Sequence, residues 1–453
     1  MVTDVRDHRI TAMDGAAAAS CSLAVENFIQ RKSDVVPHLL NAMDADPECG
    51  FATTVFGLLM HGARNANLCP QIADALSRAR ALQPGMTKRE RLYVDALGSF
   101  AQGKLYDGIA CFERILADHP TDALALVLCQ GELFWLGDMN RSLGVSSLVD
   151  HAWSESVPGY ADYLAVRAFD LEEDCQYVAA EAAGKKSVAL RSTNIWGAHA
   201  VAHVLYMQGR HQDGIDWLEP LQNEWASCNQ LTFHVWWHQC LFHLERGEHE
   251  AVIEYYDQWV RNRDQPLMQL VPDLYIDIQN GASMLWRLEH AGVDVGDRWE
   301  EMADLVLTRL DDLSNPFTSA HFAVVLAAVG NYSACDQLIK AMQSNTVDEA
   351  IPLSLRYQKS ALPAACAAIA HRRGDYDQVV TTLMPVRSAI STMGGSHAQQ
   401  DLFYQILVDA TVKIGKVDLA QQLLSEIEKI GFAQPIRRAA YQMVSAEVTE
   451  TSN

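Results

Sequence analysis

The sequence predicts an all-α protein built as a solenoid of antiparallel helical hairpins. Apolar residues recur at helical spacing along most of the 453 residues, whereas the sustained apolar and polar alternation of strands is not found. Glycines suited to ending a helix in a left-handed conformation recur between the helical stretches. With 49% hydrophobic residues the chain is able to bury an extensive core. We therefore expect a globular, right-handed superhelix of stacked hairpins.

The first hundred residues are less regular than the rest, because proline and glycine interrupt the helical pattern. Residues 73–82 and 88–100 nevertheless have clear helical periodicity. We interpret residues 1–100 as an N-terminal helical cap on one continuous solenoid formed by residues 101–447. The polar residues 448–453 are expected to form a frayed tail.

Turn glycines divide the solenoid into repeats. Gly103 and Gly137 are 34 residues apart, which is the spacing of a two-helix tetratricopeptide repeat, and later repeats are longer. A diverged turn is expected near Glu172 to Cys175, followed by a second helix over residues 177–190. The glycines that we place between the two helices of a hairpin are Gly103, Gly137, Gly209, Gly247, Gly330, Gly374 and Gly415.

Composition disfavours several partners. The formal charge of −22 repels a polyanion such as nucleic acid and gives no general attraction to an anionic membrane. No apolar run approaches the roughly 18 residues that a spanning helix needs. The ten cysteines include no C-x-x-C pair and are interpreted as reduced core thiols, and the N-terminal residues do not resemble a secretory signal. We expect a cytoplasmic protein that binds neither nucleic acid nor membrane.

Two histidine pairs are the most informative chemical feature. His199 and His203, and likewise His234 and His238, are four residues apart on predicted first helices of successive hairpins, so each pair shares one helix face. His199, His238 and His321 also precede turn glycines by nine or ten residues, which places them at similar depth in their helices. Because first helices line the inner wall of such a solenoid, these imidazoles are expected to face one pocket.

Further residues complete the predicted pocket. His397 and Asp401 form another pair at i and i+4, after Gly394-Gly395 and with Ser396 as the helix cap. We assign the catalytic chemistry to His199, His203, His234, His238, His321, His397 and Asp401. The predicted substrate-binding residues are Trp236, Trp237 and Glu172.

Two chemistries remain open for this pocket. His199, His203, His234 and His238 have the spacing to chelate a divalent transition metal, although neither pair has the glutamate of H-E-x-x-H. Without a metal, neighbouring imidazoles can supply a neutral base and a charged acid. Either chemistry suits a hydrolase or lyase that acts on a small polar metabolite.

The alternative is a scaffold without catalysis. Helical arrays of this kind commonly hold a peptide or a protein partner in their concave groove. The sequence has no G-x-x-x-x-G-K-[ST], G-x-G-x-x-G or G-x-S-x-G motif that would indicate a nucleotide site or a serine hydrolase.

Longer segments resemble a particular family. The segments that carry this resemblance are Asn194-Ile-Trp-Gly-Ala-His-Ala-Val-Ala-His-Val, His234-Val-Trp-Trp-His-Gln-Cys-Leu-Phe-His-Leu-Glu-Arg-Gly, Ser283-Met-Leu-Trp-Arg-Leu and Gly394-Gly-Ser-His-Ala-Gln-Gln-Asp401. They are similar to the family of tetratricopeptide repeat protein 38 over nearly the whole chain. The resemblance implies a helical-repeat fold but no established activity. The chain departs from the family pattern at Gln400, where the family has arginine.

Overall fold

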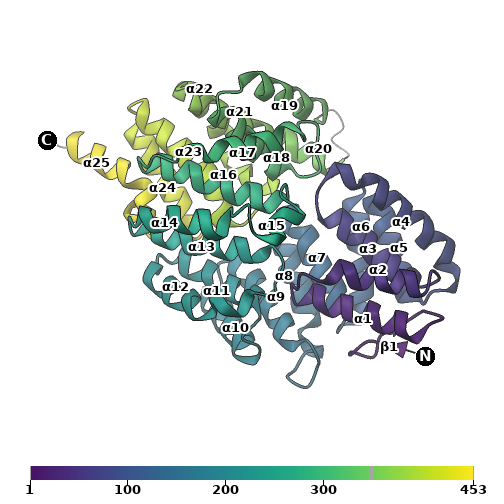
Figure 1. Cartoon of the computed structure of the whole chain (residues 1–453). Coiled ribbons are helices and arrows are strands. Elements are labelled where there is room, and N and C mark those ends of the chain that lie inside the picture. Colours follow the sequence, from purple (N-terminus) through teal and green to yellow (C-terminus); the bar gives the residue numbers. More distant parts are fainter. Residues whose placement is uncertain (1, 347–350, 452–453) are drawn as a thin grey trace. The chain divides into compact units, whose positions relative to one another are not determined.

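The computed structural model describes residues 2–346 and 351–451 and is almost entirely helical (Figure 1). This confirms the predicted all-α array of tetratricopeptide-type hairpins. The named strands among the described residues are β1 (Val2–Thr3) and β2 (Arg9–Ile10), which pair antiparallel with Val2 opposite Ile10. The handedness of the superhelix stays a prediction.

The chain forms two compact units. Unit 1 comprises Met1–Phe134, Asp138–Val201 and Leu221–Thr232, and unit 2 comprises Trp135–Gly137, Ala202–Pro220 and Phe233–Asn453. The boundary runs through the uninterrupted helix α11 (Ile195–Met207), so this helix contributes residues to both units. The sequence predicted a cap over residues 1–100 and one continuous solenoid, and did not indicate this division.

Unit 1 is made of successive hairpins. α1 packs on α2, α3 on α4, α5 on α6 and α9 on α10. Its helices are α1 (Gly15–Ile29), α2 (Val35–Ala45), α3 (Gly50–Gly62), α4 (Cys69–Leu82), α5 (Lys88–Phe100), α6 (Leu105–Asp118), α7 (Ala123–Trp135), α8 (Met139–Val149), α9 (Tyr160–Glu173), α10 (Tyr177–Leu190) and the start of α11.

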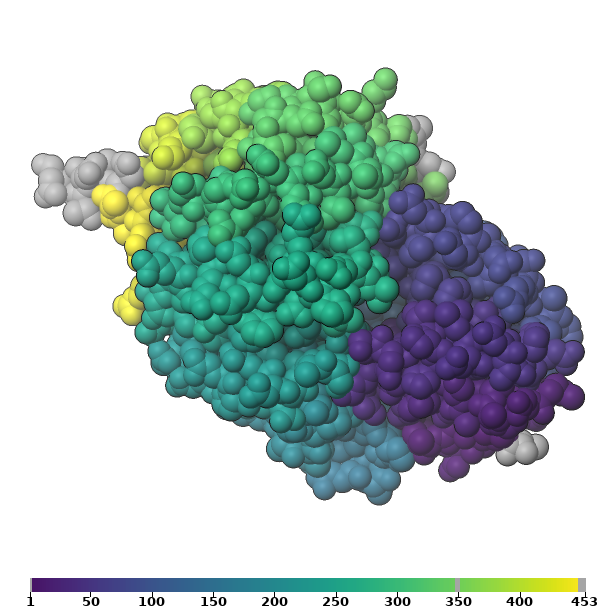
Figure 2. All heavy atoms as spheres, viewed as in Figure 1, coloured from purple at the N-terminus to yellow at the C-terminus, as the bar shows by residue number. Residues whose placement is uncertain are grey.

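Unit 2 continues the pattern, with α18 against α19, α21 against α22 and α23 against α24. In Figure 2 the spheres of residues 240–330 form a closed surface on the face that is seen. Its remaining helices are α12 (His211–Leu218), α13 (Leu231–Glu245), α14 (His249–Tyr255), α15 (Pro266–Leu270), α16 (Tyr275–His290), α17 (Arg298–Leu307), α20 (Pro352–Arg356) and α25 (Gln442–Thr451), besides α18 (Pro316–Ala328), α19 (Tyr332–Ser344), α21 (Leu362–Arg372), α22 (Tyr376–Leu383), α23 (His397–Lys413) and α24 (Val417–Lys429).

The predicted turns are present. All seven turn glycines have a positive φ, for example 72° at Gly103, which glycine adopts without steric cost. The diverged turn also lies where it was expected, because Cys175 has a φ of 59° between α9 and α10. The helix predicted over residues 177–190 is α10, with the same bounds. Local turn chemistry therefore sets the hairpins of both units.

Small residues let the two helices of a hairpin approach closely. A Cβ atom added to Gly108 on α6 would lie 2.3 Å from the ring of Phe100 on α5. A Cβ atom on Gly214 of α12 would lie 2.3 Å from the ring of Phe242 on α13. Since real Cβ contacts are not this short, the glycines allow an aromatic ring of the partner helix to pack on the backbone.

The C-terminal end of the described chain differs from one expectation, and the predicted cap at Ser396 is present. α25 includes residues 448–451, which were expected to be frayed, and residues 452–453 lie outside the described residues. Ser396 caps α23 as predicted, because its side chain accepts from the amide of Gln399 in a capping box. Among the described residues, no helix combines the length and the apolar character needed to cross a membrane.

Candidate metal centre

Two neighbouring first helices bring the predicted histidines together. His203 lies on α11, and His234 and His238 lie one turn apart on α13, all within unit 2. His199 precedes His203 by one turn of the same helix. The i and i+4 spacing therefore places each pair on one helix face, as the sequence predicted.

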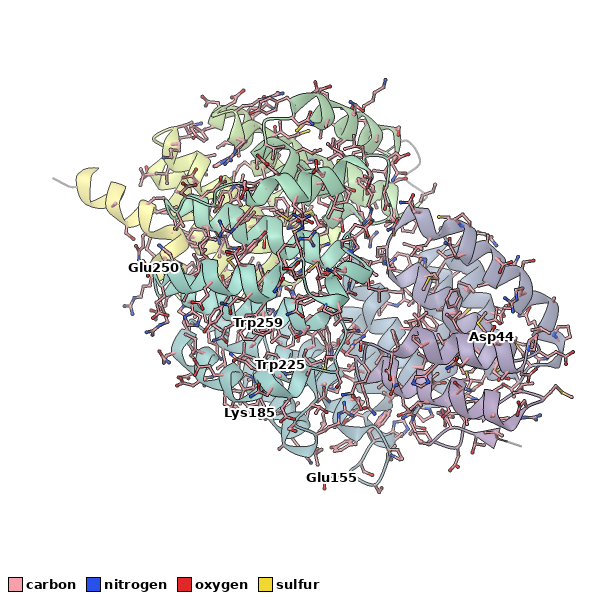
Figure 3. The ribbon with its side chains drawn as sticks, viewed as in Figure 1. Asp44, Glu155, Lys185, Trp225, Glu250 and Trp259 are labelled. Carbon is pink, nitrogen blue, oxygen red and sulfur yellow. The ribbon has the colours of Figure 1, made fainter. Side chains whose placement is uncertain are left out.

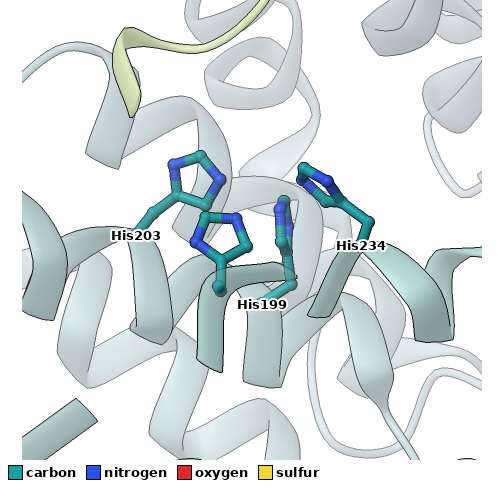
Figure 4. Close-up of side chains that lie close together, drawn as sticks. His199, His203 and His234 are labelled. Atoms are coloured by element: carbon teal, nitrogen blue, oxygen red, sulfur yellow. The ribbon is translucent and has the colours of Figure 1, made fainter. Parts of the chain in front are cut away.

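The four imidazoles form a compact group, named here the histidine quartet (His199, His203, His234 and His238; Figure 4). One nitrogen of each ring lies within 4.8 Å of one nitrogen of each other ring. The ring centroids of His203 and His238 are 4.4 Å apart, and those of His234 and His238 are 4.8 Å apart. No side chain of the quartet is more than 3% exposed.

These distances fit a tetrahedral metal. Metal to imidazole bonds of about 2.0 to 2.1 Å place neighbouring ligand nitrogens about 3.3 Å apart in a tetrahedron. The quartet nitrogens, which lie up to 4.8 Å apart, need to approach one another by at most about 1.5 Å to reach that separation. Neutral imidazole is a favoured ligand of zinc, copper and nickel, so the donor set suits a divalent transition metal.

A residue on a third helix orients His234. Nδ1 of His234 donates to Oδ1 of Asn280 on α16 over 2.8 Å. This hydrogen bond fixes the proton on Nδ1 and leaves Nε2 with the lone pair that a metal requires. Asn280 is a residue of the candidate site that the sequence did not indicate, since it follows His234 by 46 residues and belongs to no histidine motif.

Trp237 supports the same side chains. Its ring stacks on His234 at 5.2 Å between centroids, and its indole N–H donates to the hydroxyl of Ser283 on α16 over 3.0 Å. Trp236 has a different environment, because it stacks on Trp259 at 4.9 Å (Trp259 is labelled in Figure 3). The two tryptophans predicted to wall the pocket therefore have different neighbours, and Trp237 is the one that contacts the quartet.

Burial keeps His234 neutral. It lowers the pKa of His234 from 6.5 to about 3, although the hydrogen bond to Asn280 acts in the opposite direction. A base with this pKa accepts protons poorly at neutral pH. The same low pKa means that protons do not compete with a metal ion for Nε2. At His234 the low pKa therefore favours coordination over acid and base catalysis.

Asp277 is an unusual carboxyl group one turn before Asn280 on α16. It is fully buried, and within the described residues neither of its oxygens has a hydrogen-bond partner. Burial raises its pKa to about 8, with Arg261 acting weakly in the opposite direction. The carboxyl is therefore mostly protonated at neutral pH. The sequence offered no signal for it, because a single aspartate on a helix is ordinarily exposed.

His321 and His397 do not belong to the group of four nitrogens. Nδ1 of His321 donates to the carbonyl of Phe317 over 2.9 Å, and its ring packs on Phe403 at 5.4 Å between centroids. Burial lowers the pKa of His321 to about 4. His397 is the partly exposed first residue of α23. For His321, similar depth in its helix is thus not enough to bring the ring to the quartet.

Asp401 belongs to a buried ion-pair network. Its oxygens accept from Nη1 and Nη2 of Arg438 over 3.1 and 2.9 Å and from the hydroxyl of Tyr441 over 2.5 Å. Burial opposes its charge, but Arg438 holds the pKa of Asp401 below its usual value. Glu172, the predicted substrate ligand, is a fully buried residue of α9 in unit 1.

Comparison with known proteins gives remote matches. The chain matches no protein-family model. Similar solved structures include a tetratricopeptide repeat protein from Parabacteroides merdae (9% identity, TM-score 0.30, covering 71% of this chain and 97% of that one). They also include yeast Tom70, with 11% identity and a TM-score of 0.36, covering 96% of this chain and 96% of that one. A third is the human IFIT1 dimer with m7Gppp-AAAA, with 11% identity and a TM-score of 0.41, covering 98% of this chain and 97% of that one. Likeness at this level assigns no ligand to the present chain.

Proposed function

We propose that this helical-repeat protein binds a divalent transition-metal ion through His199, His203, His234 and His238. The observation that carries the proposal is the buried group of four ring nitrogens within 4.8 Å of one another. Four imidazoles complete a tetrahedral coordination sphere, which is the arrangement of closed sites. The metal then links α11 to α13 and so joins successive hairpins.

The coordination number bears on the enzymatic hypothesis. Metal-assisted hydrolysis or lyase chemistry on a small polar metabolite needs an open metal position, and four histidine ligands leave none. Acid and base catalysis needs a pKa near the working pH, whereas that of His234 is about 3. A structural or metal-holding role is therefore favoured over the predicted hydrolase or lyase.

Metal content and the spectrum of a cobalt derivative test the proposal. We expect one zinc ion per wild-type chain in elemental analysis after loading and desalting, and intense visible absorption after loading with Co²⁺, as tetrahedral coordination gives. H238Q and H203Q are expected to lose both signals. H243Q is the matched control, because His243 lies on α13 but bonds to Glu248 outside the quartet.

The possible results separate the hypotheses. A stoichiometric metal with octahedral spectra, or a metal that H238Q retains, contradicts coordination by the quartet. If wild-type protein with the expected helical circular dichroism takes up no zinc or cobalt, the metal proposal is refuted, and the scaffold with a peptide or protein partner becomes the better hypothesis.

We also infer kinship with the family of tetratricopeptide repeat protein 38. Its support is the sequence around His199 and His234, the same segments that place the quartet. A cytoplasmic location is proposed because the ten cysteines, all within the described residues, form no disulfide there and seven of them are buried, as expected of reduced thiols. The proposal that no nucleic acid binds depends on the net charge of −22 alone.

A further inference from the structure

A second polar site lies in unit 2, at the C-terminal end of α13, away from the quartet histidines His234 and His238. A cavity of ≈ 170 Å³ lies between the ends of α13 and α16, the middle of α23 and the segment that leads into α25. Leu244, Ala291, Ala439, Ala440 and Met443 give it an apolar wall. Its polar wall consists of Glu245, His249, Arg287, His290 and Gln405. No ligand of the quartet lines it.

Three buried polar atoms of this wall, on Arg287, His290 and Gln405, have no hydrogen-bond partner among the described residues. Arg287 is 2% exposed. Its Nη1 donates to the carbonyl of Ser283 and its Nη2 to the carbonyl of Ala398, both over 3.2 Å. Its Nε has no hydrogen-bond partner among the described residues. Gln405 is 1% exposed; its Nε2 donates to Asp401, whereas its Oε1 likewise accepts from no described residue. An unmade buried hydrogen bond is costly, so these atoms call for a ligand.

The charges around the cavity balance. Arg438 pairs with both Glu245 and Asp401, and Nη2 of Arg287 lies 3.9 Å from Asp401. Two guanidinium groups thus face two carboxylates. A ligand with a net charge would leave a buried charge without compensation, so the cavity favours a molecule with no net charge.

Size completes the description of the ligand. An engineered protein cavity of about 150 Å³ holds benzene. The cavity of ≈ 170 Å³ therefore suits a molecule with about as many heavy atoms as benzene, or slightly more. Nε of Arg287 requires an oxygen acceptor, and Oε1 of Gln405 requires an N–H or O–H donor. The apolar wall accommodates a short aliphatic group.

We propose that this cavity binds a small net-neutral molecule that carries a carboxylate or carbonyl oxygen beside an N–H donor, the class to which short aliphatic α-amino acids belong. The oxygen accepts from Arg287, the nitrogen donates to Gln405, and the aliphatic group contacts Leu244 and Met443. The site is independent of the metal proposal, because its polar residues are not quartet ligands.

Calorimetric titration of the full chain with L-alanine and L-valine tests the proposal, with acetate and methylammonium as probes of a single charge. We expect each amino acid to bind at least tenfold more tightly than either singly charged probe. Neutral acetamide distinguishes a requirement for a zwitterion from a requirement for an amide-like pair. Titrations before and after chelation of metal keep this result separate from that of the quartet.

Variants locate the binding. A440L fills the cavity and is expected to abolish binding, whereas A433L, at an exposed position of the same segment, is the matched control and is expected to bind as wild type does. Q405M keeps the shape but removes the acceptor, and is expected to weaken binding about tenfold. The proposal is overturned if no probe binds, if the singly charged probes bind equally well, or if A440L binds as wild type does.

Discussion

The neutral state of His234 predicts a specific pH dependence of stability in metal-free protein. Its pKa is about 3 in the folded chain and 6.5 in the unfolded chain. Between these values the unfolded state binds a proton that the folded state does not, so stability is complete above pH 6.5 and decreases as the pH falls toward 3. From pH 7 to pH 5 this one group costs about 2 kcal/mol of unfolding free energy, at about 1.4 kcal/mol per pKa unit.

Urea denaturation of chelator-treated protein at pH 7 and pH 5 measures this linkage. We expect the difference in unfolding free energy between the two pH values to be about 2 kcal/mol smaller in H234Q than in wild type. H151Q is the matched control, because His151 is exposed, and it is expected to keep the wild-type difference. Equal differences in wild type and H234Q would refute the claim that His234 is buried in its neutral form.

The same variants report on the metal. A ligand that binds only the folded state stabilises it by about 2.7 kcal/mol when its free concentration is a hundredfold above its dissociation constant. Zinc at that concentration is therefore expected to stabilise wild type and H151Q by this amount. The same zinc concentration is expected to stabilise H234Q much less.

Two further predictions concern α16. N280L removes the acceptor that orients His234, and is expected to weaken zinc binding by about 10-fold to 100-fold in competition with a chromogenic chelator. Q279L alters a buried amide bonded to Thr318 and, as the control, is expected to bind zinc with wild-type affinity. Equal zinc affinities of N280L and wild type would exclude the orienting role. D277N replaces a carboxyl whose pKa rises from 3.8 to about 8 on folding, so wild-type stability falls as the pH rises between these values. We compare the unfolding free energies of D277N and wild type at each pH. D277N is expected to exceed wild type by about 2.5 kcal/mol more at pH 7 than at pH 5. A difference between the two proteins that does not change with pH would show that Asp277 is ionised in the folded chain.

Much of the fold follows from local sequence signals. The bounds of α10 and the left-handed turn at Cys175 were predicted because turn chemistry and helical periodicity act over a few residues. The quartet was predictable for the same reason, since the i and i+4 spacing fixes a shared helix face whatever surrounds the helix. What spacing does not supply is the identity of the neighbouring helix.

Contacts distant in sequence were not predictable. Asp401 was expected in the histidine pocket, but the chain folds back to place Arg438, 37 residues later, against it. His321 has the predicted depth in its helix, yet a hydrogen bond to Phe317 within the same helix satisfies its Nδ1. The environments of Asn280 and Asp277 depend on how α16 packs, and no sequence motif predicts that packing.

Anomalous diffraction from zinc-loaded crystals, measured on both sides of the zinc absorption edge, tests the central claim most directly. We predict one strong peak enclosed by the rings of His199, His203, His234 and His238, at about 2.0 to 2.1 Å from each ligating nitrogen. A peak located only at an exposed side chain such as Cys69, or no peak among the four imidazoles, would contradict the account.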